Sequence, residues 1–311
     1  MKLSIVIPVY YNEPNLWPLY KDIKEKIISR QDIECEIVMV NDGSKDKSYQ
    51  IMQEISKEDK RVRIFSLSRN FGSHAAILCG LDQCTGDCAV VKAADLQEPT
   101  ELIIEMLESW KKGFNVVLAA RRSRPESGLS KLFSNLYYWI VRKTSFPNMP
   151  KSGFDIYLID RKVIDVIKKL DEKNSALTGQ ILWSGFRTDI VYYDRLERTA
   201  GKSRWTFKKK FRLVMDTLFS FSVVPITFVS VVGALSFFAA LIWAIVIIAF
   251  KLAGKIEISG WTSLFIFSLA AFGIIMLTLG ILGNYLWRAF DASRNRPPYI
   301  VEDTGERDSH E

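Results

Sequence analysis

The sequence predicts an α/β domain built on a doubly wound, mostly parallel sheet, followed by an amphipathic helix and two transmembrane helices. Three observations lead to this prediction. Short runs rich in Val and Ile alternate with segments of helical spacing, polar clusters follow several of these runs, and two long apolar segments without charged residues lie near the end. A chain of 311 residues has room for one catalytic domain and a smaller second part.

Five apolar runs in the first part of the chain are predicted to be strands, because nearly continuous Val and Ile suit a sheet that is covered on both faces. They are Leu3–Val9, Glu36–Val40, Val62–Leu67, Cys88–Lys92 and Asn115–Ala119. Segments of helical spacing alternate with them: Leu16–Ile28, Ser48–Ile55, Ala75–Asp82 and Glu101–Trp110. Repeated strand and helix units joined by short connections indicate a doubly wound sheet.

Polar clusters follow three of these strands. YYNEPN comes after the first strand, NDGSKD after the second and AADLQEP after the fourth. Each cluster alone is ordinary turn chemistry. Because ligands of such sheets bind at the carboxyl ends of the strands, three clusters at one edge predict a binding site there.

The region after the fifth strand is less regular. A basic, Ser-rich stretch lies between Arg121 and Ser152, and Ile156–Ile167 is predicted to be a strand that leads into a helix. Thr206–Ser222 places apolar residues on one helical face and mostly basic residues on the other. Such a helix beside a membrane span is typical of the membrane interface, and a coiled or partner-binding helix is the alternative.

Two segments near the end are long and apolar enough to cross a membrane, about Ile226–Phe250 and about Thr262–Leu286. Basic residues gather before the first span and after the second, and fewer lie in the loop between them. The positive-inside bias therefore predicts a hairpin in the membrane with both termini in the cytoplasm. The start, MKLSIVIPVY, does not have the pattern of a signal peptide.

The four cysteines agree with a cytosolic domain. Cys35, Cys79, Cys84 and Cys88 all fall in the predicted sheet domain, and disulfides are rare in the cytosol. Their spacing is poor for zinc, so buried, reduced thiols are expected. The predicted organisation is a catalytic domain over residues 1–205, an interfacial helix over 206–222, a transmembrane hairpin over 223–290 and a cytoplasmic tail over 291–311.

Asp95 is the residue with the clearest chemical meaning. A carboxylate at the end of a buried strand is costly unless a positive charge compensates it. A hard divalent cation does so, and Mg²⁺ needs only one or two carboxylates when phosphate oxygens and water complete its shell. Asp95, with the amide oxygen of Gln97, is therefore predicted to hold Mg²⁺ or Mn²⁺. Because Ala93 stands where a second acid would strengthen the site, we expect the cation to arrive with a nucleotide.

Several motifs together resemble family 2 glycosyltransferases of the GT-A fold. They are MKLSIVIPVYYNEPNL, VNDGSKD, SRNFGSHAAILCGLDQCTGD and ADLQEP. The later segments GFDIYLIDRKV, ERTAGKSRWTFKKKFRLVMDTLFSFS and LGILGNYLWRAFDASRNRPPYIV narrow the resemblance to the polyprenyl-phosphate glycosyltransferases. This group includes bactoprenol glucosyltransferases and dolichol-phosphate mannose synthases. The resemblance covers nearly the whole chain.

The chain departs from that group at four places. Ala93 replaces the first acid of the Asp-x-Asp pattern that many relatives carry, and YYNE has one tyrosine more than the usual PVYNE. Asn284 replaces a frequent glutamate, which puts a role for that acid in doubt. In GKSRW, Gly201 stands where processive synthases have glutamine, which argues against processive synthesis.

The resemblance implies roles for individual residues. It implies a nucleotide-binding set, a metal and diphosphate set, a catalytic pair and a set that contacts phosphates. The first comprises Pro8, Tyr10, Asn12, Glu13, Asp42 and Asp95, the second Asp95 and Gln97, and the third Asp95 and Asp155. The last comprises Arg121, Lys131, Ser134, Arg198, Ser203 and Arg204. Asp155 would lie beside the reacting carbon, either to orient the acceptor or to stabilise positive charge on the sugar.

The resemblance implies the inverting transfer of one sugar from a nucleotide-sugar to undecaprenyl phosphate, for cell-surface polysaccharide, at the cytoplasmic face of the plasma (inner) membrane. UDP-glucose is the first donor expected, with UDP-N-acetylglucosamine and UDP-galactose as alternatives. A polyprenyl phosphate is already an anion near neutral pH, so it needs little help from a base. Membrane lipids are expected partners, nucleic acid is not, and homo-oligomers are left open. The alternatives are a catalytically weak membrane scaffold, suggested by Ala93, and a transporter component, disfavoured because the spans lack ionisable residues.

Overall fold

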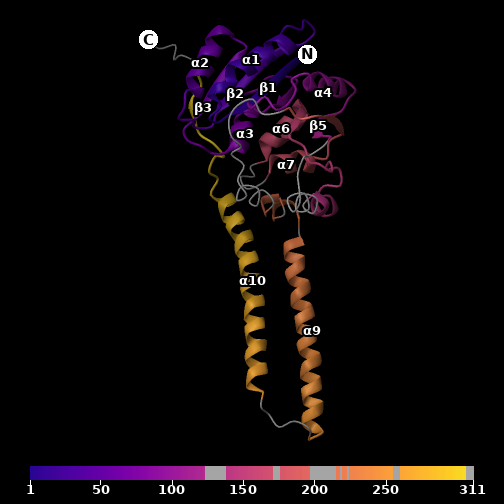
Figure 1. Cartoon of the computed structure of the whole chain (residues 1–311). Helices are drawn as coiled ribbons and strands as arrows, with labels where there is room; N and C mark the ends of the chain where they lie inside the picture. The colour runs from indigo at the N-terminus through magenta and orange to yellow at the C-terminus, as the bar shows by residue number, and fades with distance from the viewer. Residues whose placement is uncertain are drawn as a thin grey trace. The chain divides into compact units, whose positions relative to one another are not determined.

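The computed structural model describes residues 1–122, 138–170, 176–196, 215–217, 219–222, 224–254 and 260–305 (Figure 1). The chain forms two compact units. One unit contains Met1–Val214 together with Arg296–Glu311, and the other contains Met215–Asn295. The amino-terminal domain therefore also includes residues from the carboxyl end of the chain.

A mixed eight-stranded sheet organises the first unit, in the order β7-β5-β6-β4-β1-β2-β3-β8. The strands are β1 (Lys2–Val9), β2 (Glu34–Asn41), β3 (Val62–Leu67), β4 (Cys88–Val91), β5 (Val116–Arg121), β6 (Ile156–Asp160), β7 (Thr188–Tyr193) and β8 (Val301–Asp303). β1, β2, β3 and β4 run parallel to one another, as do β5 and β7. β6 and β8 run antiparallel to their neighbours. The predicted α/β fold is confirmed, and all five predicted strands are present.

The helices of this unit follow the predicted order. They are η1 (Glu13–Asn15), α1 (Leu16–Ile23), η2 (Lys24–Ile28), α2 (Ser48–Glu58), α3 (Ser73–Gln83), α4 (Leu102–Lys111), α6 (Arg161–Lys169) and α7 (Leu177–Trp183). The predicted helix Leu16–Ile28 is α1 continued by η2, a π-helical turn. Such turns widen a helix locally without ending it.

Helices cover the sheet on both faces. Ile5, Ile7 and Ile37 lie in one hydrophobic cluster with buried residues of α1, α2 and α4. On the other face α3 approaches β1 so closely that a Cβ at Gly80 would lie 2.3 Å from Val6 Cγ1. A larger residue at position 80 would have to push α3 away from the sheet. The central strands are thus buried on both sides, as their apolar sequences predict.

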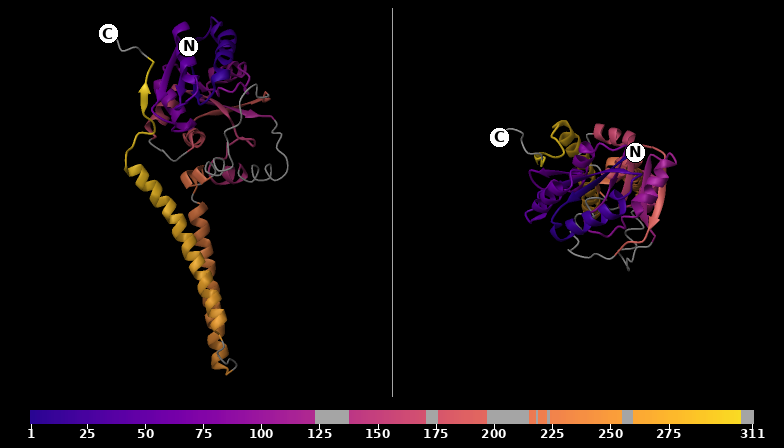
Figure 2. Two further views of the ribbon diagram at one scale, coloured as in Figure 1. Left: turned by 60° about the vertical axis from the view of Figure 1, so that its left-hand side comes forward. Right: turned by 90° about the horizontal axis from the view of Figure 1, so that it is seen from above.

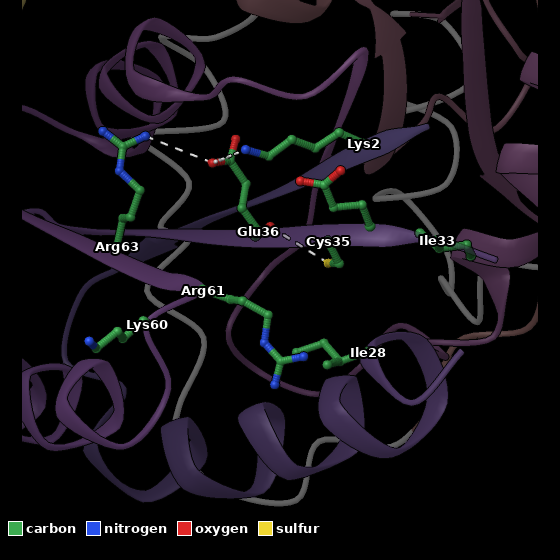
Figure 3. Close-up of a pocket in the computed structure, with 9 residues that line it drawn as sticks. Lys2, Ile28, Ile33, Cys35, Glu36, Lys60, Arg61 and Arg63 are labelled. Carbon is green, nitrogen blue, oxygen red and sulfur yellow. Dashed lines mark hydrogen bonds and ion pairs between the residues drawn. The ribbon is translucent and has the colours of Figure 1, made fainter. Parts of the chain in front are cut away.

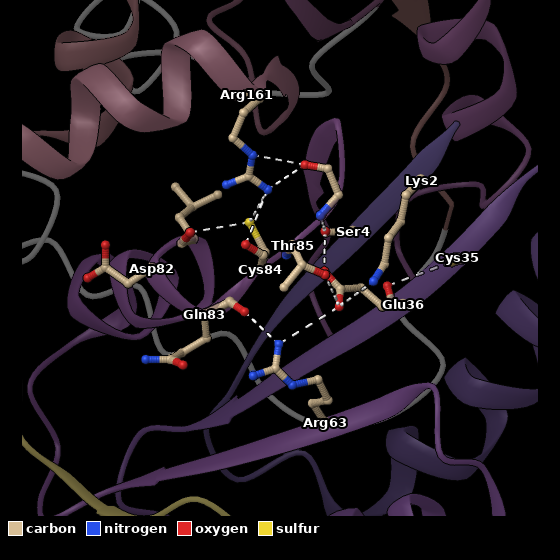
Figure 4. Close-up of polar contacts among 12 residues, drawn as sticks. Lys2, Ser4, Cys35, Glu36, Arg63, Asp82, Gln83, Cys84, Thr85 and Arg161 are labelled. Atoms are coloured by element: carbon tan, nitrogen blue, oxygen red, sulfur yellow. Dashed lines mark hydrogen bonds and ion pairs between the residues drawn. The ribbon is translucent and has the colours of Figure 1, made fainter.

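A polar cluster holds the amino ends of β1 and β2 (Figure 4). Glu36 is 5% exposed and accepts hydrogen bonds from Ser4 Oγ (2.6 Å), Thr85 N (2.5 Å) and Thr85 Oγ1 (2.9 Å). Lys2 Nζ and Arg63 Nη1 lie 3.6 Å and 3.8 Å from its carboxylate. Burial acts to raise the pKa of the Glu36 carboxyl, but the hydrogen bonds outweigh burial and hold that pKa below its ordinary value.

The second unit contains two long helices, α9 (Val224–Leu252) and α10 (Trp261–Ser293), that contact each other (Figure 1). Both contain stretches apolar and long enough to cross a membrane, Val224–Phe250 and Ala270–Ser293, and neither stretch is buried inside the described structure. Unburied apolar surface of this extent suits lipid contact. The first predicted span coincides closely with α9. The second lies within α10, which continues beyond the predicted end of that span.

A short segment packs against the end of α10. Residues 215–217 and 219–221 are helical, and the remainder of the predicted amphipathic helix before them lies outside the described residues. Arg288 Nη2 donates to Asp216 Oδ1 at 2.7 Å, and Arg288 Nη1 donates to Ser220 Oγ at 2.9 Å. The rings of Phe219 and Tyr285 meet edge to face, with centroids 5.3 Å apart. These contacts join the segment before α9 to the cytoplasmic end predicted for α10.

Candidate active site

The polar clusters meet at the carboxyl ends of the parallel strands, as the sequence predicts. The segment after β1 is hydrogen-bonded to the segment after β2. Tyr11 N donates to Ser44 Oγ, and Asn12 N donates to Ser48 Oγ, each at 3.0 Å. The chain after β4 carries Asp95 at the same edge, because β4 lies beside β1 and parallel to it. Side chains from the segments after three strands thus lie together at the carboxyl ends of the parallel strands.

A cavity of about 810 Å³ lies at this edge, over the ends of β1, β2 and β3. Its size suits a nucleotide or a similar small molecule. Tyr10 and Tyr11 line it, with their rings edge to face and centroids 4.7 Å apart. Tyr11 has a φ of 53°, a left-handed conformation that is uncommon outside glycine and is often found at functional sites. The turn accommodates the extra tyrosine of the YYNE segment through the strained backbone of Tyr11, and both tyrosine rings line the cavity.

Gly43 meets a steric requirement in the same cavity. It has a φ of 67°, and a Cβ at this position would lie 2.6 Å from both Arg69 C and Asn70 N. The backbone after β2 therefore passes directly against the backbone after β3. A side chain at position 43 would force these two walls of the cavity apart.

Asp42 links the same two loops. Its side chain is 2% exposed. Oδ1 accepts from Phe71 N at 2.7 Å, and Oδ2 accepts from Gly72 N at 3.0 Å and from Asn70 Nδ2 at 2.9 Å. The carboxylate predicted to bind the nucleoside is thus engaged with the loop after β3, and it shapes the cavity from behind.

The remaining predicted nucleotide-binding residues support the turn around the cavity. Asn12 Oδ1 accepts from Tyr10 N at 3.2 Å, and Glu13 Oε2 accepts from Lys47 N at 3.1 Å. Pro8 pairs with Val40 inside the sheet. Of the five residues predicted before Asp95 in this set, Tyr10 is the one that lines the cavity.

Asp95 stands on a second strained turn. Leu96 has a φ of 58°, and Gln97 N donates to Asp95 Oδ1 at 3.4 Å. Leu96 is partly buried and packs against the main core. A left-handed leucine costs of the order of 1–3 kcal/mol and persists only where its surroundings impose it. The core contact of Leu96 thus fixes the turn that presents Asp95 and Gln97.

The chain after β7 attaches to this turn. Leu196 N donates to Gln97 O at 2.9 Å, and Gln97 Nε2 donates to Leu196 O at 3.5 Å. Arg195 Nη2 donates to Gln97 Oε1, the oxygen predicted to face a metal. No local pattern indicates this contact, because 98 residues separate its partners. It places a guanidinium beside the predicted diphosphate position.

Asp155 lies at the same edge and is held by two side chains. Arg121 Nε is 2.5 Å from Asp155 Oδ2 as an ion pair, although its N–H is not aligned for a hydrogen bond. Tyr193 OH donates to the same oxygen at 3.3 Å. Burial, and then the Asp155 charge, raise the pKa of Tyr193, so the phenol keeps its proton and remains a donor. Arg121, predicted to contact phosphates, and Tyr193, which the sequence analysis missed, both position Asp155.

A buried pair lies beneath Asp95. Lys92 is 1% exposed and its Nζ donates to Glu98 O at 2.7 Å. Glu98 is 5% exposed, and its Oε2 has no hydrogen-bond partner within the described part of the chain. Burial first, and then the charge of Asp95, raise the pKa of Glu98 to about 7. Burial lowers the pKa of Lys92. Neither residue was predicted, because Lys92 continues an apolar strand and Glu98 resembles an ordinary turn residue.

The donor chemistry at this edge fits a hard divalent cation. Asp95 offers a carboxylate, and Gln97 offers an amide oxygen that would exchange its hydrogen bond from Arg195 for the cation. Oxygen donors of this kind suit Mg²⁺ and Mn²⁺. Within the described residues no group of three His, Cys, Asp or Glu side chains is arranged to hold a metal ion. The protein groups present therefore suit a cation whose remaining ligands come from a diphosphate and water.

Five predicted phosphate-binding residues cannot be placed in this geometry. Lys131, Ser134, Arg198, Ser203 and Arg204 lie outside the described residues.

A second cavity, of about 360 Å³, lies at the opposite end of β1, β2 and β3 (Figure 3). Lys2 and Arg63 in its lining each form an ion pair with Glu36, and Arg61 Nε lies 2.8 Å from Asp59 Oδ1. Burial raises the pKa of Cys35 to about 12, so its thiol remains protonated. This cavity lies away from the carboxyl ends of the strands and is therefore separate from the candidate site.

The four cysteines are free and buried, as predicted.

Comparison with known proteins identifies the family. Residues 4–157 match the model of "Glycosyl transferase family 2". The chain is 39% identical to an uncharacterized glycosyltransferase, YkcC, of Bacillus subtilis, over 97% of this chain and 94% of that protein. It is 34% identical to a prophage bactoprenol glucosyl transferase homolog of Escherichia coli, over 97% of this chain and 99% of that protein. The bactoprenol glucosyl transferase of Shigella phage SfV is 33% identical over 97% of this chain and 98% of its own.

Proposed function

Because this chain belongs to family 2 of the glycosyltransferases, with the GT-A fold, we propose that it transfers one sugar from a nucleotide-sugar to a polyprenyl phosphate at a membrane surface. One observation carries the proposal. The cavity beside Tyr10 and the carboxylates of Asp95 and Asp155 share one edge of the sheet, in a chain that also has two long, unburied apolar helices. Relatives named for a bactoprenol acceptor match nearly the full length.

The strand order suggests how a nucleotide-sugar lies on this edge. Three inter-strand spacings separate β4 from β3, about 14 Å. That span accommodates an extended nucleoside diphosphate. The nucleoside would occupy the cavity over β1, β2 and β3, and the diphosphate would reach Asp95 and Gln97 beyond β4. The sugar would then lie toward Asp155, which directly precedes β6, the strand next to β4 in the sheet.

In the proposed reaction an acceptor phosphate oxygen forms a bond to the anomeric carbon as the bond from that carbon to the donor diphosphate breaks. A single displacement of this kind inverts the configuration. The nucleophile needs no base, because the second pKa of a phosphate monoester is about 6. Asp155, fixed by Arg121 and Tyr193, stabilises positive charge on the sugar or orients the acceptor. Arg195 faces negative charge that develops on the leaving diphosphate.

Asp95 and Gln97 would hold Mg²⁺ or Mn²⁺, which when bound neutralises charge on the leaving diphosphate. Lys92 and Glu98 keep the chain beneath these ligands in place. The two apolar helices would fix the reaction at the headgroup level, where the acceptor phosphate lies. Such positioning supplies a large part of the rate in many enzymes. The proposed location is the inner membrane, with the sheet domain and both termini in the cytoplasm.

The test is transfer of label to lipid by the full-length protein. Purified protein in detergent would be incubated with Mg²⁺, a short polyprenyl phosphate and each of several radiolabelled nucleotide-sugars, UDP-glucose first. We expect labelled lipid with at least one donor, and its loss on chelation and in Asp95→Asn. Asp165→Asn is the matched control, since Asp165 is exposed on α6.

The competing function is a membrane scaffold that keeps the fold without turnover, suggested by Ala93. No labelled lipid with any donor would support that function and contradict the proposal. Product that persists in Asp95→Asn at the wild-type rate would contradict the role given to Asp95.

A further inference from the structure

The carboxyl-terminal strand β8 joins the sheet beside the candidate donor cavity. It follows α10 by a short connection and pairs antiparallel with β3, Leu67 opposite Val301 and Ser66 opposite Asp303. Ser68 N donates to Ile300 O at 3.0 Å and extends the pairing. Figure 2 shows β8 as the yellow arrow near the carboxyl terminus. The last described strand of the chain therefore forms the edge of the sheet next to β3.

Side-chain contacts fix β8 at both of its ends. Tyr299 OH donates to Asp82 Oδ2 on α3. Tyr49 OH on α2 donates to Asp303 Oδ2 at 2.5 Å, and Gly305 N donates to Asp303 Oδ1 at 2.8 Å. Burial, and then Asp303, raise the pKa of Tyr49, so the phenol remains a donor near neutral pH. Two of these contacts, Tyr299 with Asp82 and Tyr49 with Asp303, thus hold β8 in its register against the domain.

This register places acidic residues in the wall of the donor cavity. Glu302 and Asp303 line it together with Tyr49, Lys45 and Arg69. Asp303 uses both carboxylate oxygens for Tyr49 and Gly305. Glu302 is exposed, and no ion pair involves it within the described residues. Glu302 is therefore the acid on β8 whose carboxylate can meet a ligand.

The chemistry of a carboxylate decides which end of a nucleotide-sugar it can face. An ionised carboxylate only accepts hydrogen bonds, and its negative charge repels the negatively charged diphosphate. The donors that a nucleotide offers are the ribose hydroxyls and the N–H groups of the base. An acidic side chain on the ribose hydroxyls is an established solution in other nucleotide-binding folds. Glu302 at the β3 side of the sheet, opposite to Asp95, thus agrees with the donor orientation proposed above.

We propose that Glu302 of β8 accepts hydrogen bonds from the ribose hydroxyls of the donor, so that the chain beyond the second apolar helix completes the nucleotide site. This inference rests on the proposed function, because it assigns the cavity to the nucleoside of the donor. If β8 only covered the open edge of β3, ligand affinity would not depend on Glu302.

The experiment measures nucleotide affinity of the full-length protein in detergent by calorimetry, with Mg²⁺. UDP, GDP, ADP and CDP are compared first, and the tightest ligand is then compared with its 2′,3′-dideoxy analogue. We expect Glu302→Gln to weaken binding of the ribonucleotide by roughly 10- to 100-fold, because the acceptor of two hydroxyl hydrogen bonds loses its charge. Binding of the dideoxy analogue should be weak in the wild type and unchanged by the substitution.

Glu54→Gln is the matched control, because Glu54 is exposed on α2 and does not line the cavity. Thermal unfolding should be equal in both variants, since Glu302 is exposed. Unchanged affinity in Glu302→Gln, or an equal loss for the ribonucleotide and its dideoxy analogue, would overturn the inference. A wild-type protein that binds none of the four nucleotides would contradict the proposed function itself, and the two failures are therefore distinguishable.

Discussion

Replacement of Asp42 by asparagine tests whether this carboxylate builds the donor cavity or contacts the nucleotide. In the structure the buried carboxylate receives three donors from the loop after β3: Phe71 N, Gly72 N and Asn70 Nδ2. Asparagine keeps the shape but removes the charge, and its own NH₂ group then faces one of these donors. Hydrogen bonds to charged groups exceed neutral ones by about 1 kcal/mol each. Three such bonds predict a loss of about 3 kcal/mol in unfolding free energy.

The assay is thermal unfolding of the full-length protein, combined with nucleotide affinity measured well below the transition. A domain of this size shifts its melting temperature by about 2–4 °C per kcal/mol, so Asp42→Asn should melt roughly 6–12 °C lower. Affinity should fall by about 10-fold, since Arg69 and Asn70 line the cavity on the released loop. Asp165→Asn should change neither quantity. A shift below 2 °C with a far larger loss of affinity would refute the reasoning and return Asp42 to direct nucleotide contact.

Four further changes test other parts of the structure. Gly43→Ala should lower nucleotide affinity at least 10-fold by calorimetry. The added Cβ would clash with the backbone of Arg69 and Asn70, and alanine disfavours the positive φ of this residue. Affinity equal to that of the wild type would contradict this packing. Asp155→Asn should reduce turnover by about 10²-fold in the lipid-labelling assay while nucleotide affinity stays within twofold, and an unchanged rate would remove Asp155 from the reaction. Glu36→Gln should cost about 2–4 kcal/mol in denaturant unfolding, because Ser4 and Thr85 lose a charged acceptor; equal midpoints would argue against the buried cluster. The last test concerns pH. Burial lowers the pKa of His74 from its ordinary value of 6.5 to about 4. Between these two pH values the unfolded chain binds a proton at His74 that the folded chain does not bind. The free energy of unfolding therefore falls by about 3 kcal/mol from pH 6.5 to pH 4. His74→Asn should remove that part of the pH dependence, and an unaltered pH profile of unfolding would contradict it.

The strands that position the site were predictable from local pattern. Val and Ile runs bounded by polar clusters located β1, β2, β3 and β4, and with them Asp95 at the shared edge. Ligands of parallel sheets bind at the carboxyl ends of the strands, and this position depends only on strand direction. It could therefore be predicted without knowledge of tertiary contacts. The π-helical turn at the end of α1 left no such trace, since its sequence keeps the ordinary helical spacing.

Other parts of the site depend on contacts between distant segments. Tyr193 meets Asp155 and Arg195 meets Gln97 because β7 pairs with β5, which no local pattern specifies. β8 has three residues and no alternation of its own, so only its pairing with β3 makes it a strand. Residues 291–311 are accordingly predicted to be a tail, whereas residues 301–303 belong to the sheet.

The late position of β8 in the chain has a consequence for biosynthesis. A ribosome must add more than two hundred residues after Leu67 before Val301 emerges to pair with the same edge. At about 5–20 residues per second this takes roughly 10–50 s. During that time the outer edge of β3 is an open template for foreign strands, and nascent chains on one messenger would be at risk of joining there. Maturation of the domain would therefore end only after both long apolar helices, α9 and α10, have been synthesised.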